Sequence, residues 1–266
     1  MCLIAAVGLS AACTNEGPAP RSTDPDAVNS SVAVSKAGKA PSPAERCTKS
    51  GNTTARKAVL TTSDKVNLAG VAFGSGARGV LLLPQAGADL CSWWDYANEL
   101  VGKGFHVLAI DLRGTGYSDA GKAADYTADA EAGVAELKRD GAARVVIVGA
   151  ALGAATALVT AGRVPDQIAG VVSLSYPDNA LDVTAGGGSG PRTPIQAAPL
   201  ITAPLLICFT AGDKQVTAKP QDLIDKVHSA GKQLVGRPGV SHGWDMLKIG
   251  DDDVRTDIMG FLESYA

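Results

Sequence analysis

The sequence predicts a three-layer α/β fold, in which helices cover both faces of a mainly parallel, eight-stranded sheet. About eight short runs of valine, isoleucine and leucine are bounded by turn residues, as buried strands are. Helical segments separate most of the later runs, and strands that alternate with helices form parallel sheets covered on both sides. With 266 residues, 45% of them hydrophobic, the chain can bury one large core.

The individual elements follow one another along the chain. Strands are expected at KAVLTT (57–62), VNLAGVAF (66–73), GVLLLP (79–84), FHVLAID (105–111), RVVIVG (144–149), AGVVSLS (169–175), PLLICFT (204–210) and KQLVG (232–236). Helices are expected at 92–104, 126–141, 153–163, 219–231 and 251–266, several of them opening on Ser, Thr or Asp. Because no helix separates the first two strands, we expect them to form an antiparallel hairpin at one edge.

The first thirteen residues, MCLIAAVGLSAAC, have the character of a signal peptide. Their apolar run is too short to span a bilayer, and it ends in small residues before Cys13. This ending resembles a bacterial lipobox, although Ser10 stands where leucine is usual, and the resemblance implies that Cys13 is lipidated. An ordinary cleaved signal peptide, giving a secreted protein, is the alternative.

Residues 14–46 are rich in Pro, Ser, Ala and Asp without apolar periodicity. Such a segment buries too little apolar area to repay its ordering entropy, so we expect a disordered tether. The folded domain is then expected over 47–266. A lipidated cysteine, a spacer and a domain indicate a protein held at the outer face of a cell membrane.

Export would place the remaining cysteines in an oxidising compartment. Cys47 at the start of the domain and Cys91 after the third strand are then candidates for a disulfide, which sequence alone does not decide. Cys208 lies inside an apolar strand, where a cysteine behaves as a small hydrophobic residue.

The segment VVIVGAALGAATAL, residues 145–158, has the pattern of a strand, a tight turn of small residues and a helix. This arrangement presents a serine nucleophile in the motif G-x-S-x-G. Here the pattern reads Gly149, Ala150, Ala151, Leu152, Gly153, so alanine occupies the nucleophile position.

Five pieces of the chain, in order, resemble the α/β-hydrolase fold family, with the dienelactone-hydrolase-like and small bacterial esterase-like group as its nearest kind. The pieces are LLLPQAG (81–87), DLRGTGYSD (111–119), GAALG (149–153), AGDKQV (211–216) and GVSHGW (239–244). The resemblance covers about residues 55 to 266. The connection before PLLICF is too short for a large cap domain, so none is expected.

The resemblance implies the last two members of a Ser…Asp…His triad. His242 follows the final strand and would take the proton of a nucleophile, while Asp213 would orient its imidazole. Asp178 competes with Asp213 because some relatives draw the acid from the preceding strand. His106 is expected inside a strand and His228 on a solvated helix face.

The oxyanion hole of the family is built from backbone N–H groups. The resemblance assigns these to Leu152 at the start of the helix and to Gln85 or Ala86 in the loop after the third strand. None of these donors depends on a side chain. The protein is therefore expected to keep a pocket for a carbonyl or an anion while lacking the attacking atom at Ala151.

Three interpretations remain open. The domain is a pseudoenzyme that binds an ester-like or carboxylate-like small molecule, or a partner. Alternatively it is an enzyme that uses His242 with water, or another nucleophile such as Ser173, Ser175 or Cys91. In the third interpretation, Ala151 is an engineered replacement of a serine.

Charge and composition limit the ligands. The net charge of −3 and the lack of a basic run argue against a nucleic-acid partner, and neither a metal nor an organic cofactor is expected. Residues 74–79 fit G-x-G-x-x-G but precede a strand and open no helix, so a turn is expected there rather than a dinucleotide site. The glycine-rich residues 186–194 are expected to form a mobile loop.

Overall fold

The computed structural model describes residues 35–47, 55–185, 189–248 and 252–266. The expected signal peptide, its Cys13 and residues 14–34 of the expected tether lie outside the described residues, as do residues 186–188 of the glycine-rich loop. Among the described helices, none combines the length and the apolar character that crossing a membrane requires.

All eight expected strands are present in one sheet. They are β1 (Arg56–Thr61), β2 (Asn67–Phe73), β3 (Arg78–Leu83), β4 (His106–Ile110), β5 (Arg144–Ala150), β6 (Gly170–Leu174), β7 (Leu205–Thr210) and β8 (Lys232–Arg237), in the spatial order β1-β2-β4-β3-β5-β6-β7-β8. The expected hairpin is confirmed, since β1 pairs with β2 antiparallel at the edge. β2 also pairs antiparallel with β4, and the remaining pairs are parallel.

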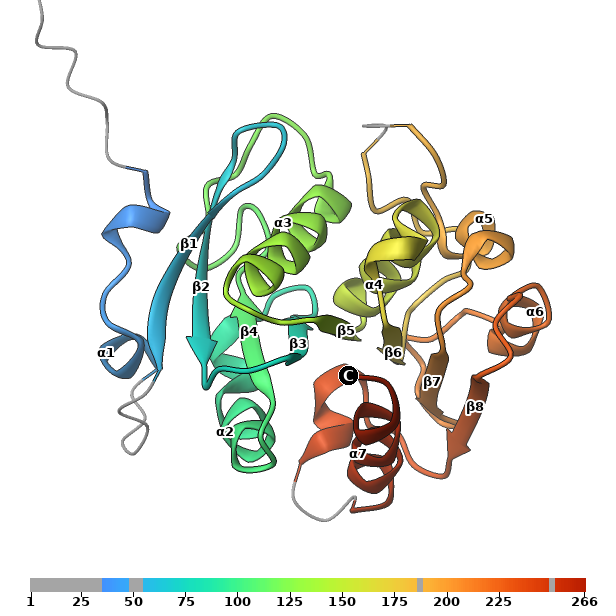
Figure 1. The fold of residues 1–266 in the computed structure, drawn as a ribbon. Helices are drawn as coiled ribbons and strands as arrows, with labels where there is room; N and C mark the ends of the chain where they lie inside the picture. Colours follow the sequence, from blue (N-terminus) through green and yellow to red (C-terminus); the bar gives the residue numbers. More distant parts are fainter. Residues whose placement is uncertain (1–34, 48–54, 186–188, 249–251) are drawn as a thin grey trace, which may run out of the picture. The chain divides into compact units, whose positions relative to one another are not determined.

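Helices lie on both faces of the sheet, so the predicted three-layer architecture is confirmed (Figure 1). The α-helices are α1 (Pro43–Cys47), α2 (Trp94–Gly102), α3 (Tyr126–Arg139), α4 (Leu152–Arg163), α5 (Pro194–Ala197), α6 (Pro220–Ile224) and α7 (Asp252–Tyr265). The 3₁₀ turns are η1 (Ala37–Lys39), η2 (Leu90–Trp93), η3 (Pro165–Gln167), η4 (Ala198–Leu200) and η5 (Gly243–Leu247). Between β6 and β7 the described residues form only α5 and η4, without a large cap.

The alternation of side chains along β3 divides the core into two parts. Leu81 and Leu83 pack into the cluster under α3 and α4, whereas Val80 and Leu82 pack into the cluster with α2 and α7. All four side chains are fully buried. A strand buried on both faces reads as a continuous apolar run, which is why GVLLLP shows no polar alternation.

The helix expected over 219–231 is much shorter than the sequence suggested. α6 ends at Ile224, where the Val227 N–H donates to the Ile224 carbonyl oxygen three residues back. The Lys232 ammonium group also donates to the carbonyl oxygens of Ile224 and Val227, and so caps the end of this turn. His228, expected on a helix face, is exposed but lies beyond the helix.

Residues 35–46, which the sequence analysis assigned to the tether, pack against the domain. In the segment 35–47, Ala37 and Ala40 are buried against Ala69 of β2. Lys57 of β1 donates hydrogen bonds to the carbonyl oxygens of Gly38 and Ala40. These contacts supply burial that the composition of the segment alone did not indicate.

Candidate active site

The nucleophile elbow is formed between β5 and α4, with Ala151 at its tip. The backbone of Ala151 has φ 45° and ψ −107°, a conformation that L-residues rarely adopt. The flanking glycines permit the close packing: a Cβ at Gly149 would lie 2.2 Å from the Gly153 carbonyl oxygen, and one at Gly153 would lie 2.3 Å from the Leu83 oxygen. The turn therefore keeps the shape that presents a nucleophile, although its side chain is a methyl group.

The elbow is held by hydrogen bonds at both ends. The Ala151 N–H donates to the Leu174 carbonyl oxygen at 2.9 Å, and the Ala155 N–H donates to the Ala151 oxygen at 3.0 Å. A strained backbone of this kind costs on the order of 1–3 kcal/mol and persists only where the surroundings fix it. Here β6 and the first turn of α4 fix it.

Asp213 and His242 meet as the resemblance implied. Their elements are neighbours in the sheet, since Asp213 follows β7 and His242 follows β8. The Asp213 Oδ2 atom lies 2.7 Å from the His242 Nδ1 atom, and Asp213 Oδ1 accepts a hydrogen bond from the Gln215 N–H. The Asp213 side chain is 1% exposed and that of His242 is 12% exposed. An ionised carboxylate only accepts hydrogen bonds, so Nδ1 carries the proton and Nε2 is left as the basic nitrogen.

The turn that carries His242 packs against the elbow and the oxyanion loop. Gly243 has φ 56°, and a Cβ there would lie 2.3 Å from Gln85 Oε1 and 3.5 Å from the Ala150 Cβ. The Trp244 N–H also donates to Gln85 Oε1 at 3.3 Å. Sequence reasoning missed this role of the Gln85 side chain, and the glycine after His242 was its only local signal.

The three expected oxyanion donors lie at the start of α4 and in the loop after β3. Leu152 is the first residue of α4, whose N–H has no acceptor within the helix. Within the described residues, the backbone N–H groups of Gln85 and Ala86 make no hydrogen bond. The N-terminus of a helix attracts negative charge, so this corner can receive a carbonyl oxygen or an anion.

None of the alternative nucleophiles is available. Ser173 is fully buried in β6, and Ser175 is 1% exposed with its hydroxyl donating to the Met246 sulfur at 3.3 Å. Cys91 forms a disulfide with Cys47, with an S–S distance of 2.04 Å and a Cα–Cα distance of 5.2 Å. The bonded Cys91 offers no thiolate, and the two serines lie inside the packed core.

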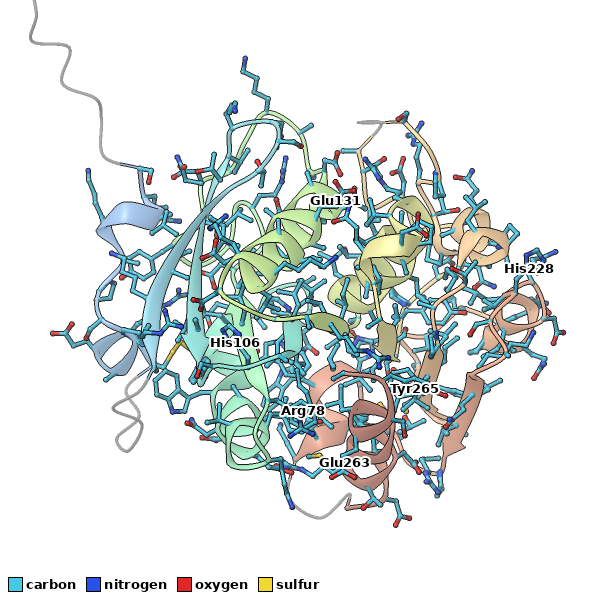
Figure 2. The ribbon with its side chains drawn as sticks, viewed as in Figure 1. Arg78, His106, Glu131, His228, Glu263 and Tyr265 are labelled. Carbon is cyan, nitrogen blue, oxygen red and sulfur yellow. A yellow bond between two sulfur atoms is a disulfide. The ribbon has the colours of Figure 1, made fainter. Side chains whose placement is uncertain are left out.

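The other candidate side chains lie elsewhere. Asp178 accepts hydrogen bonds from the Ala180 N–H and the Thr217 hydroxyl, which lower the pKa of its carboxyl, and it makes no bond to His242. His106 is buried in β4 with its Nε2 atom 3.1 Å from Asp140. In Figure 2, His106 is labelled to the left and His228 at the far right. Cys208 is buried in β7, outside the disulfide.

Arg46, which the sequence placed in the tether, pairs with two aspartates near the oxyanion loop. Its guanidinium donates to Asp111 at 2.6 Å, and Asp111 also accepts from the N–H groups of Leu90 and Tyr117. Asp89 lies 3.4 Å from the same guanidinium. Burial raises the pKa of the Asp111 carboxyl while these bonds oppose the shift. The DLRGTGYSD turn is thus tied to the N-terminal segment.

A cavity of about 540 Å³ opens over the oxyanion loop. It is lined by Gly87, Ala88, Asp89, Ser92, Thr115, Gly116 and Trp244. No group of three or more His, Cys, Asp or Glu side chains within the described ranges could hold a metal ion. The polar side chains in this lining are those of Asp89, Ser92 and Thr115.

Comparison with known proteins supports the same fold. Residues 79–188 match the family model described as "alpha/beta hydrolase fold". An esterase from Pyrococcus furiosus shares 17% identity over 85% of this chain and 96% of its own, with a TM-score of 0.66. An esterase from Exiguobacterium antarcticum shares 14% identity over 78% of this chain and 100% of its own, with a TM-score of 0.61. No curated protein matches the sequence.

The strand order, the elbow, the Asp213–His242 pair and these similarities together define the class. The protein has the α/β-hydrolase fold, and esterases are among its structural neighbours.

Proposed function

We propose that this protein is a non-hydrolytic member of its fold, which binds a small ester-like or carboxylate-like molecule at the elbow, where Ala151 stands in place of a serine. The observation that carries the proposal is the methyl group of Ala151 at the point where a hydroxyl would attack. Removing the serine of a serine protease lowers kcat by about 10⁶, because the covalent step is lost. The backbone donors at Gln85, Ala86 and Leu152 do not depend on that hydroxyl, so they still favour an oxygen that carries negative charge.

The intact Asp213–His242 pair supports a second function. A histidine with a free basic nitrogen can take a proton from a water molecule or from a bound ligand without a covalent intermediate. This enzyme would depend on His242 and would be insensitive to serine-directed inhibitors. We rank it second because it would have to proceed without a nucleophile at the elbow.

Restoring the serine separates the two functions. Wild-type protein should show no hydrolysis of p-nitrophenyl acetate above that of Ala151→Gly, which changes the elbow without adding a nucleophile. Ala151→Ser should hydrolyse the ester, because the proposal assigns Nε2 of His242 as the base and the backbone N–H groups as the oxyanion donors. The restored rate is expected to be low, since catalysis demands placement to within about 1 Å. The measurement is the release of p-nitrophenolate under single-turnover and steady-state conditions.

The matched control is the double variant Ala151→Ser/His242→Ala, which should lose the restored activity. Fast turnover by wild-type protein that disappears in His242→Ala would refute the non-hydrolytic proposal and favour the histidine-driven enzyme. Ligand binding is tested separately by titrating butyrate into the wild type and following the amide resonances of Leu152 and Ala86 by NMR. Unchanged resonances at a saturating concentration would refute the anion site.

We also propose that the protein is exported and anchored by a lipid on Cys13. The lipobox-like ending supports this, and the Cys47–Cys91 disulfide is of a kind that persists in oxidising compartments. Mass spectrometry of protein extracted from membranes should find an acylated Cys13 at the mature N-terminus. A mature chain that is secreted freely and begins elsewhere would contradict the anchor.

A further inference from the structure

A second cavity, of about 530 Å³, lies beside the site on the face of the sheet that carries α2 and α7. Its aromatic and aliphatic lining comes from Trp93, Tyr96, Trp244 and Leu247, and its polar lining comes from Ser92, Asp95, Glu99, Lys248 and Arg255. A cavity of this size and apolar character is typical of sites for small organic molecules. Neither the elbow nor the Asp213–His242 pair contributes to its lining, so it is separate from the ligand site proposed above.

The charged side chains that line this cavity are Asp95, Glu99, Lys248 and Arg255, so the two signs balance. Glu99 forms an ion pair with Arg255, whose Nε also donates to the Leu247 carbonyl oxygen. Lys248 pairs with Asp245 at 2.8 Å, and its ammonium group lies 4.8 Å from the centre of the Trp244 ring. With the signs balanced, the lining gives no net attraction to an anion or to a cation.

The aromatic part of the lining is uncharged. Burial raises the pKa of the Tyr96 hydroxyl, which therefore remains a neutral phenol. The rings of Trp93 and Tyr96 are tilted at 45° with centroids 6.3 Å apart. Aromatic walls of this kind favour flat apolar molecules, which pack edge-to-face or offset against them.

We propose that this cavity is a binding site for an uncharged aromatic molecule. Trp244 connects it to the candidate active site, because Trp244 lines both cavities and its backbone N–H donates a hydrogen bond to the Gln85 side chain. Trp244 also stands two residues after His242 in the same turn. An occupant that moves the Trp244 ring would therefore act on the His242 turn without touching the elbow.

The test uses N-phenyl-1-naphthylamine, a neutral aromatic probe that fluoresces in apolar surroundings. The full-length wild type should bind one equivalent and transfer energy from its tryptophans, since two of the three, Trp93 and Trp244, line the cavity. Two variants place a phenyl ring in the lining: Ser92→Phe, shared by both cavities, and Asp95→Phe, from an exposed position of this one. Each should weaken binding by about tenfold or more, which corresponds to about 1.4 kcal/mol.

The matched control is Ser264→Phe, which adds the same ring at an exposed position of α7 outside both cavities and should leave binding unchanged. His242→Ala should also retain binding, and this result distinguishes the cavity from the proposed elbow site. Absence of saturable binding would overturn the proposal. So would equal affinity in Asp95→Phe and the wild type, or a loss of binding confined to His242→Ala.

Discussion

The Cys47–Cys91 disulfide should contribute a large part of the stability of this domain. It closes a loop with a sequence separation of 44 residues, which would otherwise be free in the unfolded chain. The loop-closure entropy for that length corresponds to about 4 kcal/mol at 25 °C. In the folded state the bond also holds the end of α1, so that Arg46 stays paired with the buried Asp111.

The perturbation is the double variant Cys47→Ala/Cys91→Ala, compared with wild type by differential scanning calorimetry. In a domain of this size, 1 kcal/mol shifts Tm by about 2–4 °C, so the expected fall is about 8–16 °C. Reducing agent should lower the Tm of wild type by a similar amount and leave the double variant unaffected. Cys208→Ala keeps the disulfide and should remain sensitive to the reductant. A fall below about 3 °C in the double variant would refute the reasoning.

The remaining predictions concern the elbow and the turn after β4. Gly153→Ala should destabilise the protein by about 3 kcal/mol in urea unfolding, because its Cβ would meet backbone atoms of Leu83; Gly260→Ala, in open space on α7, should instead stabilise it by about 0.5–1 kcal/mol, and similar values for both would contradict the packing at the elbow. A hydrogen bond from Arg113 lowers the pKa of Asp64 to about 2 in the folded protein, from its ordinary value of 3.8. The Asp64 carboxylate therefore contributes its full stabilisation of the fold above pH 3.8 and loses it as the pH falls through about 2. Asp64→Asn should therefore flatten the acid limb of a stability–pH profile, and an unchanged limb would rule this pair out.

The sequence alone was sufficient for the architecture because the signals are local. Each β-branched or leucine-rich run is a strand, buried except at the two edges β1 and β8, and the glycines of GAALG mark a turn in which a Cβ would clash with backbone. The alanine at the elbow is likewise visible in the sequence, since the pattern places it at residue 151. The two faces of β3 follow from the twofold period of any strand.

Other features were decided by contacts between distant segments. The choice of Asp213 over Asp178 depends on which loop faces His242, and both aspartates follow a strand. Arg46 reaches Asp111 across 65 residues, and Gln85 reaches Trp244 across 159. No local pattern reports such pairs, because each forms only when the sheet brings the ends of different strands to one edge. The end of α6 also involves a contact from outside the helix, since the Lys232 side chain donates to the carbonyl oxygens of Ile224 and Val227 there.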